Sequence, residues 1–173
     1  MEGYSSQFEV GSIIKSDKSI VPLNSKSKEL VAKWPEYQKF AEFVGQYQEI
    51  TMSDALLNSA ELSVMAQQLK DSIRVDNLKI PSIKMRLNVL YSETMRLADM
   101  ATIPTITEEA VLRENNNIIH AFSALNLKIN TINSMNKLNE EISSFVNEVA
   151  QEEVRETDSV PVPISAPSSP PKE

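Results

Sequence analysis

The side chains that could carry out acid, base or metal chemistry in this chain are few and widely spaced. His120 is the only histidine, and the chain has no cysteine. A catalytic histidine and most metal sites need a second suitable side chain within reach. Position 120 lies about 200° around a helix from Ile118, away from the apolar face that Ile118 begins. We therefore interpret His120 as a solvated surface side chain.

The paired carboxylates are neighbours in the sequence: Glu108-Glu109, Glu140-Glu141 and Glu152-Glu153. Adjacent helical residues point about 100° apart, so none of these pairs forms an acid–base dyad. No glycine follows Gly45, which excludes a phosphate-binding Gly-rich loop and a nucleophile elbow from the rest of the chain. The sequence therefore predicts a protein without enzymatic activity, without a cofactor and without a metal site.

A basic cluster surrounds residues 75–81 and forms the only other group of chemically interesting side chains. Its members are Lys70, Arg74, Lys79, Lys84 and Arg86. We interpret the cluster as an ordinary polar end of a helical bundle, because surface charges are common and individually weak. The alternative is a docking patch for an acidic partner or a phosphate. The net charge of -7 makes nucleic acid an improbable partner.

Prolines divide the chain into segments of helical periodicity. The spacing of apolar residues predicts helices over about residues 35–49, 53–74, 82–100 and 107–150. Pro35 suits a first helical turn, and Thr51 with Asp54 fits a capping box for the second helix. Gly45 makes the first helix the weakest of the four.

The last predicted helix carries two apolar rows, one after the other. The first row has alternating steps of four and three residues, and its members are Ile118, Phe122, Leu125, Ile129 and Ile132. Its continuation would be polar, and a second row replaces it. We call this second row the distal row: Met135, Leu138, Ile142, Phe145 and Val149. The shift indicates that the helix changes packing partners halfway.

Helix lengths indicate where the distal row lies. At 1.5 Å per residue, the second and third helices are about 30 Å long, whereas the last is about 65 Å. The two shorter helices can therefore cover only its first half. The helix over 35–49, about 22 Å long, is one candidate cover for the distal row. Another protein or a second copy of the chain is the other candidate.

These patterns predict an all-α protein, a three- to four-helix up-and-down bundle with a long C-terminal helix. We expect a flexible or partly extended arm over 1–25, the helical domain over 26–151 and a disordered, Pro-rich acidic tail over 152–173. Aromatic residues make up 6% of the chain, so the core must be mostly aliphatic. No apolar run of about 18 residues occurs, so no transmembrane segment is expected.

The leading functional hypothesis is a non-enzymatic interaction or scaffold protein that uses the distal row to bind itself or a protein partner. The alternative is a small-molecule or lipid-binding bundle, with a pocket lined by Met65, Leu90, Met95 and Phe122. No signal-peptide pattern is present at the N-terminus, so the default location is the cytoplasm. An exported protein whose targeting segment had been removed would look the same.

Overall fold

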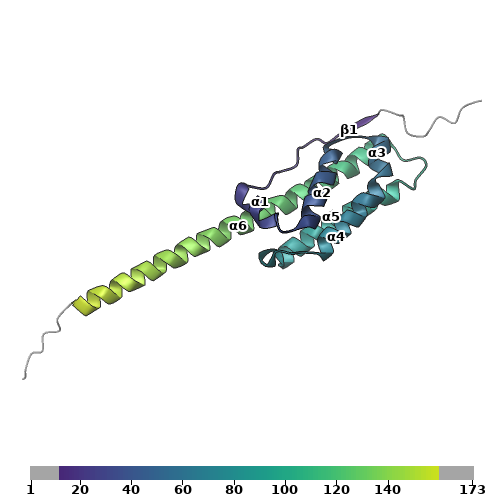
Figure 1. Cartoon of the computed structure of the whole chain (residues 1–173). Helices are drawn as coiled ribbons and strands as arrows, with labels where there is room; N and C mark the ends of the chain where they lie inside the picture. Colours follow the sequence, from purple (N-terminus) through teal and green to yellow (C-terminus); the bar gives the residue numbers. More distant parts are fainter. Residues whose placement is uncertain (1–11, 160–173) are drawn as a thin grey trace, which may run out of the picture. The chain divides into compact units, whose positions relative to one another are not determined.

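The computed structural model describes residues 12–159 as helices joined by short connections (Figure 1). Its α-helices are α1 (Ser25–Val31), α2 (Pro35–Gly45), α3 (Met52–Leu57), α4 (Ser59–Asp71), α5 (Pro81–Met100) and α6 (Glu108–Ser159). Two 3₁₀ turns, Gln46–Gln48 and Asp76–Leu78, follow α2 and α4. The predicted all-α class is confirmed, although α1 was not among the predicted helices.

A short β-pairing was missed by the sequence prediction. Strand β1 (Ile13–Lys15) runs antiparallel to β2 (Glu49–Thr51), with Ile14 opposite Ile50. The Ile14 side chain is buried in the core, and this burial joins the N-terminal residues to the helices. Each strand has only three residues, too few for an alternating pattern to stand out in the sequence.

Several helix ends differ from the prediction, whereas Pro35 and Thr51 each mark a helix start as predicted. Pro35 occupies the first turn of α2, and the Oγ1 of Thr51 accepts a hydrogen bond from the Asp54 backbone N–H at 3.1 Å. The predicted helix over 35–49 ends at Gly45, because residues 49–51 pair as a strand. The predicted helix over 53–74 is broken at Asn58 into α3 and α4.

The described residues divide into two compact units between Ser134 and Met135, within α6. In the first unit, α4 packs against α5 and α2 packs against α4. Aromatic rings join α2 to α6: the Phe122 ring lies 5.8 Å from the Tyr37 ring and 5.4 Å from the Phe40 ring. Among the residues whose burial is described, the buried hydrophobic side chains lie between Ile14 and Ile129, so this core belongs to the first unit.

The second unit consists of the distal part of α6, from Met135. The helix continues to Ser159, so residues 152–159 of the predicted tail are helical, and residues 160–173 lie outside the described range. Side chains from residue 137 to residue 157 are all exposed. Residues 1–11 of the predicted arm also lie outside the described range.

Candidate functional site

Residues 12–24, which we call the arm, are held to α6 by a ladder of polar side chains. At its start, the Oδ1 of Asn116 accepts hydrogen bonds from the Ser16 hydroxyl and the Asp17 backbone N–H, both at 3.0 Å. At its end, Asn130 accepts from the Asn24 backbone N–H at 2.9 Å and donates to the Pro22 carbonyl at 3.1 Å. Side chains of α6 thus satisfy backbone groups of residues 17–24, which lie beyond the three-residue pairing of β1 with β2.

In the middle of the arm, both backbone groups of Val21 are hydrogen-bonded to side chains of α6. The Val21 backbone N–H donates to the Oγ of Ser123 at 3.1 Å, and the Val21 carbonyl accepts from the Nδ2 of Asn126 at 2.8 Å. We call Asn116, Ser123, Asn126 and Asn130 the clasp. Its residues lie at steps of seven, three and four along α6, so they face one side of the helix.

His120 lies beside the clasp. Its Nε2 is 3.2 Å from the Oδ1 of Asp17 in the arm, and its side chain is 44% exposed. The interpretation of a surface imidazole matches this exposure, but the contact with the arm was not predicted. The hydroxyl of the neighbouring Ser16 donates to Asn116, so Ser16 does not donate it to Asp17.

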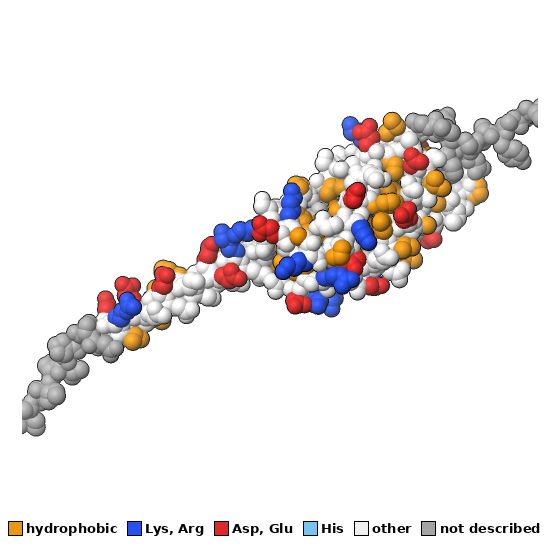
Figure 2. Space-filling view, viewed as in Figure 1, with side chains coloured by type: hydrophobic (Ala, Val, Ile, Leu, Met, Phe, Trp, Pro, Cys, Tyr) orange, Lys and Arg blue, Asp and Glu red, His pale blue; other side chains and the backbone are white. Residues whose placement is uncertain are grey.

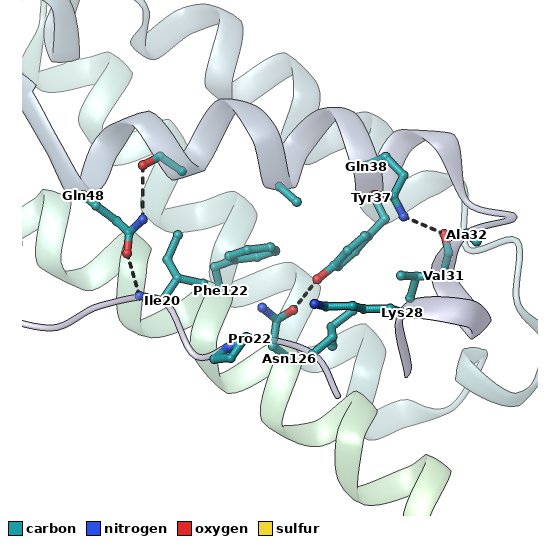
Figure 3. A pocket seen from close by; sticks show the side chains of 13 residues that line it. Ile20, Pro22, Lys28, Val31, Ala32, Tyr37, Gln38, Gln48, Phe122 and Asn126 are labelled. Carbon is teal, nitrogen blue, oxygen red and sulfur yellow. Dashed lines mark hydrogen bonds between the residues drawn. The ribbon is translucent and has the colours of Figure 1, made fainter. Parts of the chain in front are cut away.

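A cavity of about 620 Å³ lies where the arm, α1, α2 and α6 meet (Figure 3). Apolar groups from all four elements line it: Ile20, Pro22 and Leu23 from the arm, Val31 from α1, Ala41 from α2 and Phe122 from α6. The arm therefore supplies one wall, and the clasp holds that wall in place.

Most polar side chains of the cavity are hydrogen-bonded to other groups of the cavity wall. The Tyr37 hydroxyl donates to the Oδ1 of Asn126 at 2.6 Å, and burial raises the pKa of Tyr37, so the hydroxyl keeps its proton. Gln48 accepts from the Ile20 backbone N–H at 2.9 Å, and Gln38 donates to the Val31 carbonyl at 3.1 Å. Lys28 also lines the cavity, and no described acid forms an ion pair with it.

Of the four residues of the predicted pocket, only Phe122 lines the cavity described above. Leu90 is buried in the core, whereas Met95, on another face of α5, is 42% exposed, and Met65 is partly buried. Phe122 shares the cavity wall with arm and α2 residues. The prediction did not include the arm as a wall of the pocket.

The basic cluster is largely paired with neighbouring groups. Arg74 makes a two-pronged ion pair with Glu36, which lowers the pKa of Glu36 to about 2 through hydrogen bonding. Lys79 contacts Asp76 at 2.7 Å, and Lys70 lies 5.1 Å above the Tyr91 ring. Arg86 donates to the Ser82 carbonyl, and neither Arg86 nor Lys84 forms an ion pair among residues 12–159. This pairing favours the interpretation of an ordinary bundle end.

One buried acid was missed by the sequence prediction. Glu114 is only 5% exposed, and burial, followed by its interaction with the Glu93 carboxylate, raises its pKa to about 7. Arg96 lies 3.8 Å from its Oε2, while its Oε1 has no hydrogen-bond partner. The pair of acids sits between α5 and α6, where a single shared proton removes their repulsion.

The side chains of the distal row are exposed, as they would be in a helix without a cover. Their exposed fractions run from 40% at Val149 to 66% at Phe145. Helix α2, one of the two candidate covers, packs on Phe122 instead. Figure 2 shows apolar side chains lying among acidic ones on this segment.

No family model, curated protein or solved structure matches the chain. Within residues 12–159 no group of three or more His, Cys, Asp or Glu side chains could hold a metal ion. Helices of the same range also lack the combination of length and hydrophobicity needed to cross a bilayer.

Proposed function

We propose that this chain is a non-enzymatic interaction protein that binds another helix along the distal row of α6. The exposed distal row is the observation that carries the proposal: five apolar side chains, each at least 40% exposed, at alternating steps of three and four. This spacing forms the seam of a coiled coil. A helix in a protein gains most of its stability by packing its apolar face against another element.

Charges beside the seam favour a particular partner. Glu141 and Glu148 flank the distal row on one side, and Glu153 flanks its end on the other. In a parallel pair of two copies, Glu148 would face the other copy's Glu153. In the antiparallel pair that overlaps the apolar residues best, Glu141 would face Glu148. Acid would meet acid in both cases, so we infer a partner helix with Lys or Arg beside its apolar seam.

The test uses two synthetic heptad peptides that share one apolar seam. One carries Lys at the flanking positions, and the other carries Glu. We expect the full chain to bind the Lys peptide and to reject the Glu peptide, with the preference weakening as salt increases. Calorimetry at two salt concentrations measures both affinities, and light scattering over a tenfold concentration range reports self-association.

Matched double variants locate the contact. Leu138→Asp with Ile142→Asp places two charges in the seam and should abolish binding. Ser144→Asp with Asn147→Asp adds the same charge on the opposite side of the helix and should not. Unchanged binding by the seam variant, with helicity retained by circular dichroism, would overturn the proposal. A concentration-dependent mass that only the seam variant removes would instead make a second copy the partner.

A second candidate function, binding of a small molecule or lipid, is favoured by the cavity between the arm, α1, α2 and α6. Its volume falls within the range of about 300–1,000 Å³ that is usual for ligand sites. This candidate does not depend on the distal row, because every residue that lines the cavity lies between Ile20 and Asn126.

A further inference from the structure

The cavity presents an apolar interior whose polar groups are already satisfied. The Tyr37 hydroxyl and the Asn126 amide bond to each other, and the Gln48 amide bonds to the Ile20 backbone N–H and the Gly45 carbonyl. A ligand that offered hydrogen-bonding groups to these walls would have to replace bonds that hold the arm and α2 in place. The body of a fitting ligand is therefore apolar, and it lies against Leu23, Val31 and Phe122.

Lys28 is the one charge at this cavity without a counter-charge. In Figure 3 its ammonium points toward the hydrogen bond between Tyr37 and Asn126. The lysines of the basic cluster differ in this respect, because Lys70 and Lys79 each have an acid within 4.0 Å. A cation beside an apolar cavity can be matched by an anionic group of a ligand whose apolar part fills the space.

From these two features we propose that the cavity binds a small amphiphile with a single acid group. Its hydrocarbon part lies between the arm, α2 and Phe122, and its carboxylate or phosphate meets the ammonium of Lys28. This inference develops the second candidate function by assigning the ligand class and the residue that recognises it. It is independent of the distal row, so either proposal can fail without the other.

The ligand and the arm support each other in this arrangement. Because residues 20–23 form one wall, a bound hydrocarbon adds apolar contacts to the hydrogen bonds that hold the arm on α6. Ligand binding should therefore protect the arm from cleavage at Lys18, which is exposed.

The experiment compares decanoate, decyl phosphate and decanol, below the concentrations at which they form micelles. Each is titrated into the full chain and followed by amide chemical shifts in two-dimensional NMR. We expect saturable shifts in the arm and α2, with at least one acid bound about tenfold more tightly than decanol, which is a typical effect of a charged hydrogen bond. The tighter of the two acids identifies the head group.

Three variants assign the effect to the cavity and to Lys28. Lys28→Met should bring the affinity for the acids down to that for decanol. Lys26→Met, on the same helix but outside the cavity lining, should leave the tenfold preference unchanged. Ala41→Phe places a ring in the cavity and should weaken all three probes.

Two outcomes would overturn the inference. One is the absence of saturable shifts for either acid in the native chain. The other is a preference for acids that survives in Lys28→Met while the variant melts as the native chain does. If Ala41→Phe fails to fold, the Lys28 and Lys26 variants still decide the outcome, because both substitutions replace exposed side chains.

Discussion

Glu114 is an acid that the fold buries against a second acid. Its protonated carboxyl lies between α5 and α6, where it donates a hydrogen bond to the Glu93 carboxylate and only the exposed Arg96 offers positive charge. Burial is the larger cause of its raised pKa, and Glu93 is the next. The protonated form of Glu114 is thus the one that the folded protein accommodates.

The stability of the protein should therefore depend on pH through this residue. The pKa of Glu114 is raised from 4.5 to about 7, so the folded state holds the proton more tightly than the unfolded state. Its contribution is complete below about pH 4.5 and is lost as the pH rises through 7. We expect the unfolding free energy of the native chain to fall by about 2 kcal/mol between pH 5 and pH 8. In Glu114→Gln this fall should be absent. Urea unfolding at the two pH values measures it.

Glu109→Gln provides the control for this prediction. Glu109 is an exposed acid on the same helix, and its replacement should leave the pH dependence as in the native chain. Native and Glu114→Gln curves that ran parallel from pH 5 to pH 8 would contradict the prediction.

For single residues, the burial of apolar side chains was easier to predict than the contacts of polar side chains. Five residues were expected on one packed face of the last helix, of which the first four are buried and the last is partly buried: Ile118, Phe122, Leu125, Ile129 and Ile132. The clasp asparagines were not identified, because a polar residue on a helix reads as solvated unless its partner is known. A signal was present: asparagine is a poor helix former, so Asn126 and Asn130 inside a long helix indicate a contact that offsets the cost.

Among the elements, the arm depends most on side chains from elsewhere in the chain. Beyond its three-residue pairing with β2, its backbone is bound by the clasp, by Gln48 and by burial of Ile14 and Leu23. Hydrogen bonds of this kind contribute about 1 kcal/mol each, so several are needed to hold an extended segment.

Removal of two clasp residues should release the arm while the helices stay folded. Asn116→Ala with Asn130→Ala deletes four hydrogen bonds to residues 16–24. We expect trypsin to cut after Lys18 at least about tenfold faster, since cleavage follows the population of the open form. The free energy of unfolding should fall by only about 1–2 kcal/mol, because alanine favours the helix. Mass spectrometry of timed digests measures the cleavage.

Asn136→Ala provides the matched control, because Asn136 is on the same helix and makes no hydrogen bond to the arm. Its cleavage rate should equal that of the native chain. The same rate in the double variant would show that the clasp does not hold the arm.

Element boundaries were predicted where a local signal existed and missed where a distant contact decided them. Pro35 and Thr51 mark the starts of α2 and α3 through groups that act within one turn. The end of α2 at Gly45 depends on the pairing of residues 49–51 with 13–15, far back in the sequence. No glycine or proline lies near Asn58, so no local signal in the sequence marks the break there.

For the molecule as a whole, the buried core and the distal part of α6 belong to different units. Within residues 12–157, every buried hydrophobic side chain precedes residue 130, and side chains 137–157 are exposed. The first unit should therefore fold without the second. This division was predictable, because helix length and the shift between the two apolar rows are local properties of the sequence.

A chain that ends at Asn133 should be as stable as the full chain. We expect its free energy of unfolding to change by less than about 1 kcal/mol, since no core side chain is removed. Urea unfolding followed by tryptophan fluorescence reports on Trp34, which is fully buried. A loss of about 3 kcal/mol or more would show that the distal part of α6 supports the core.

The clasp also affects the order in which the protein can fold during synthesis. The arm leaves the ribosome before α6, because the clasp residues that bind it are 99–108 positions further along the chain. At about 5–20 residues per second, the arm waits roughly 5–20 s before α6 is available. Through that interval the nascent chain has no complete cavity and keeps its first apolar residues uncovered. A chaperone that binds nascent chains could bind these apolar residues during the interval, which ends when Asn130 emerges.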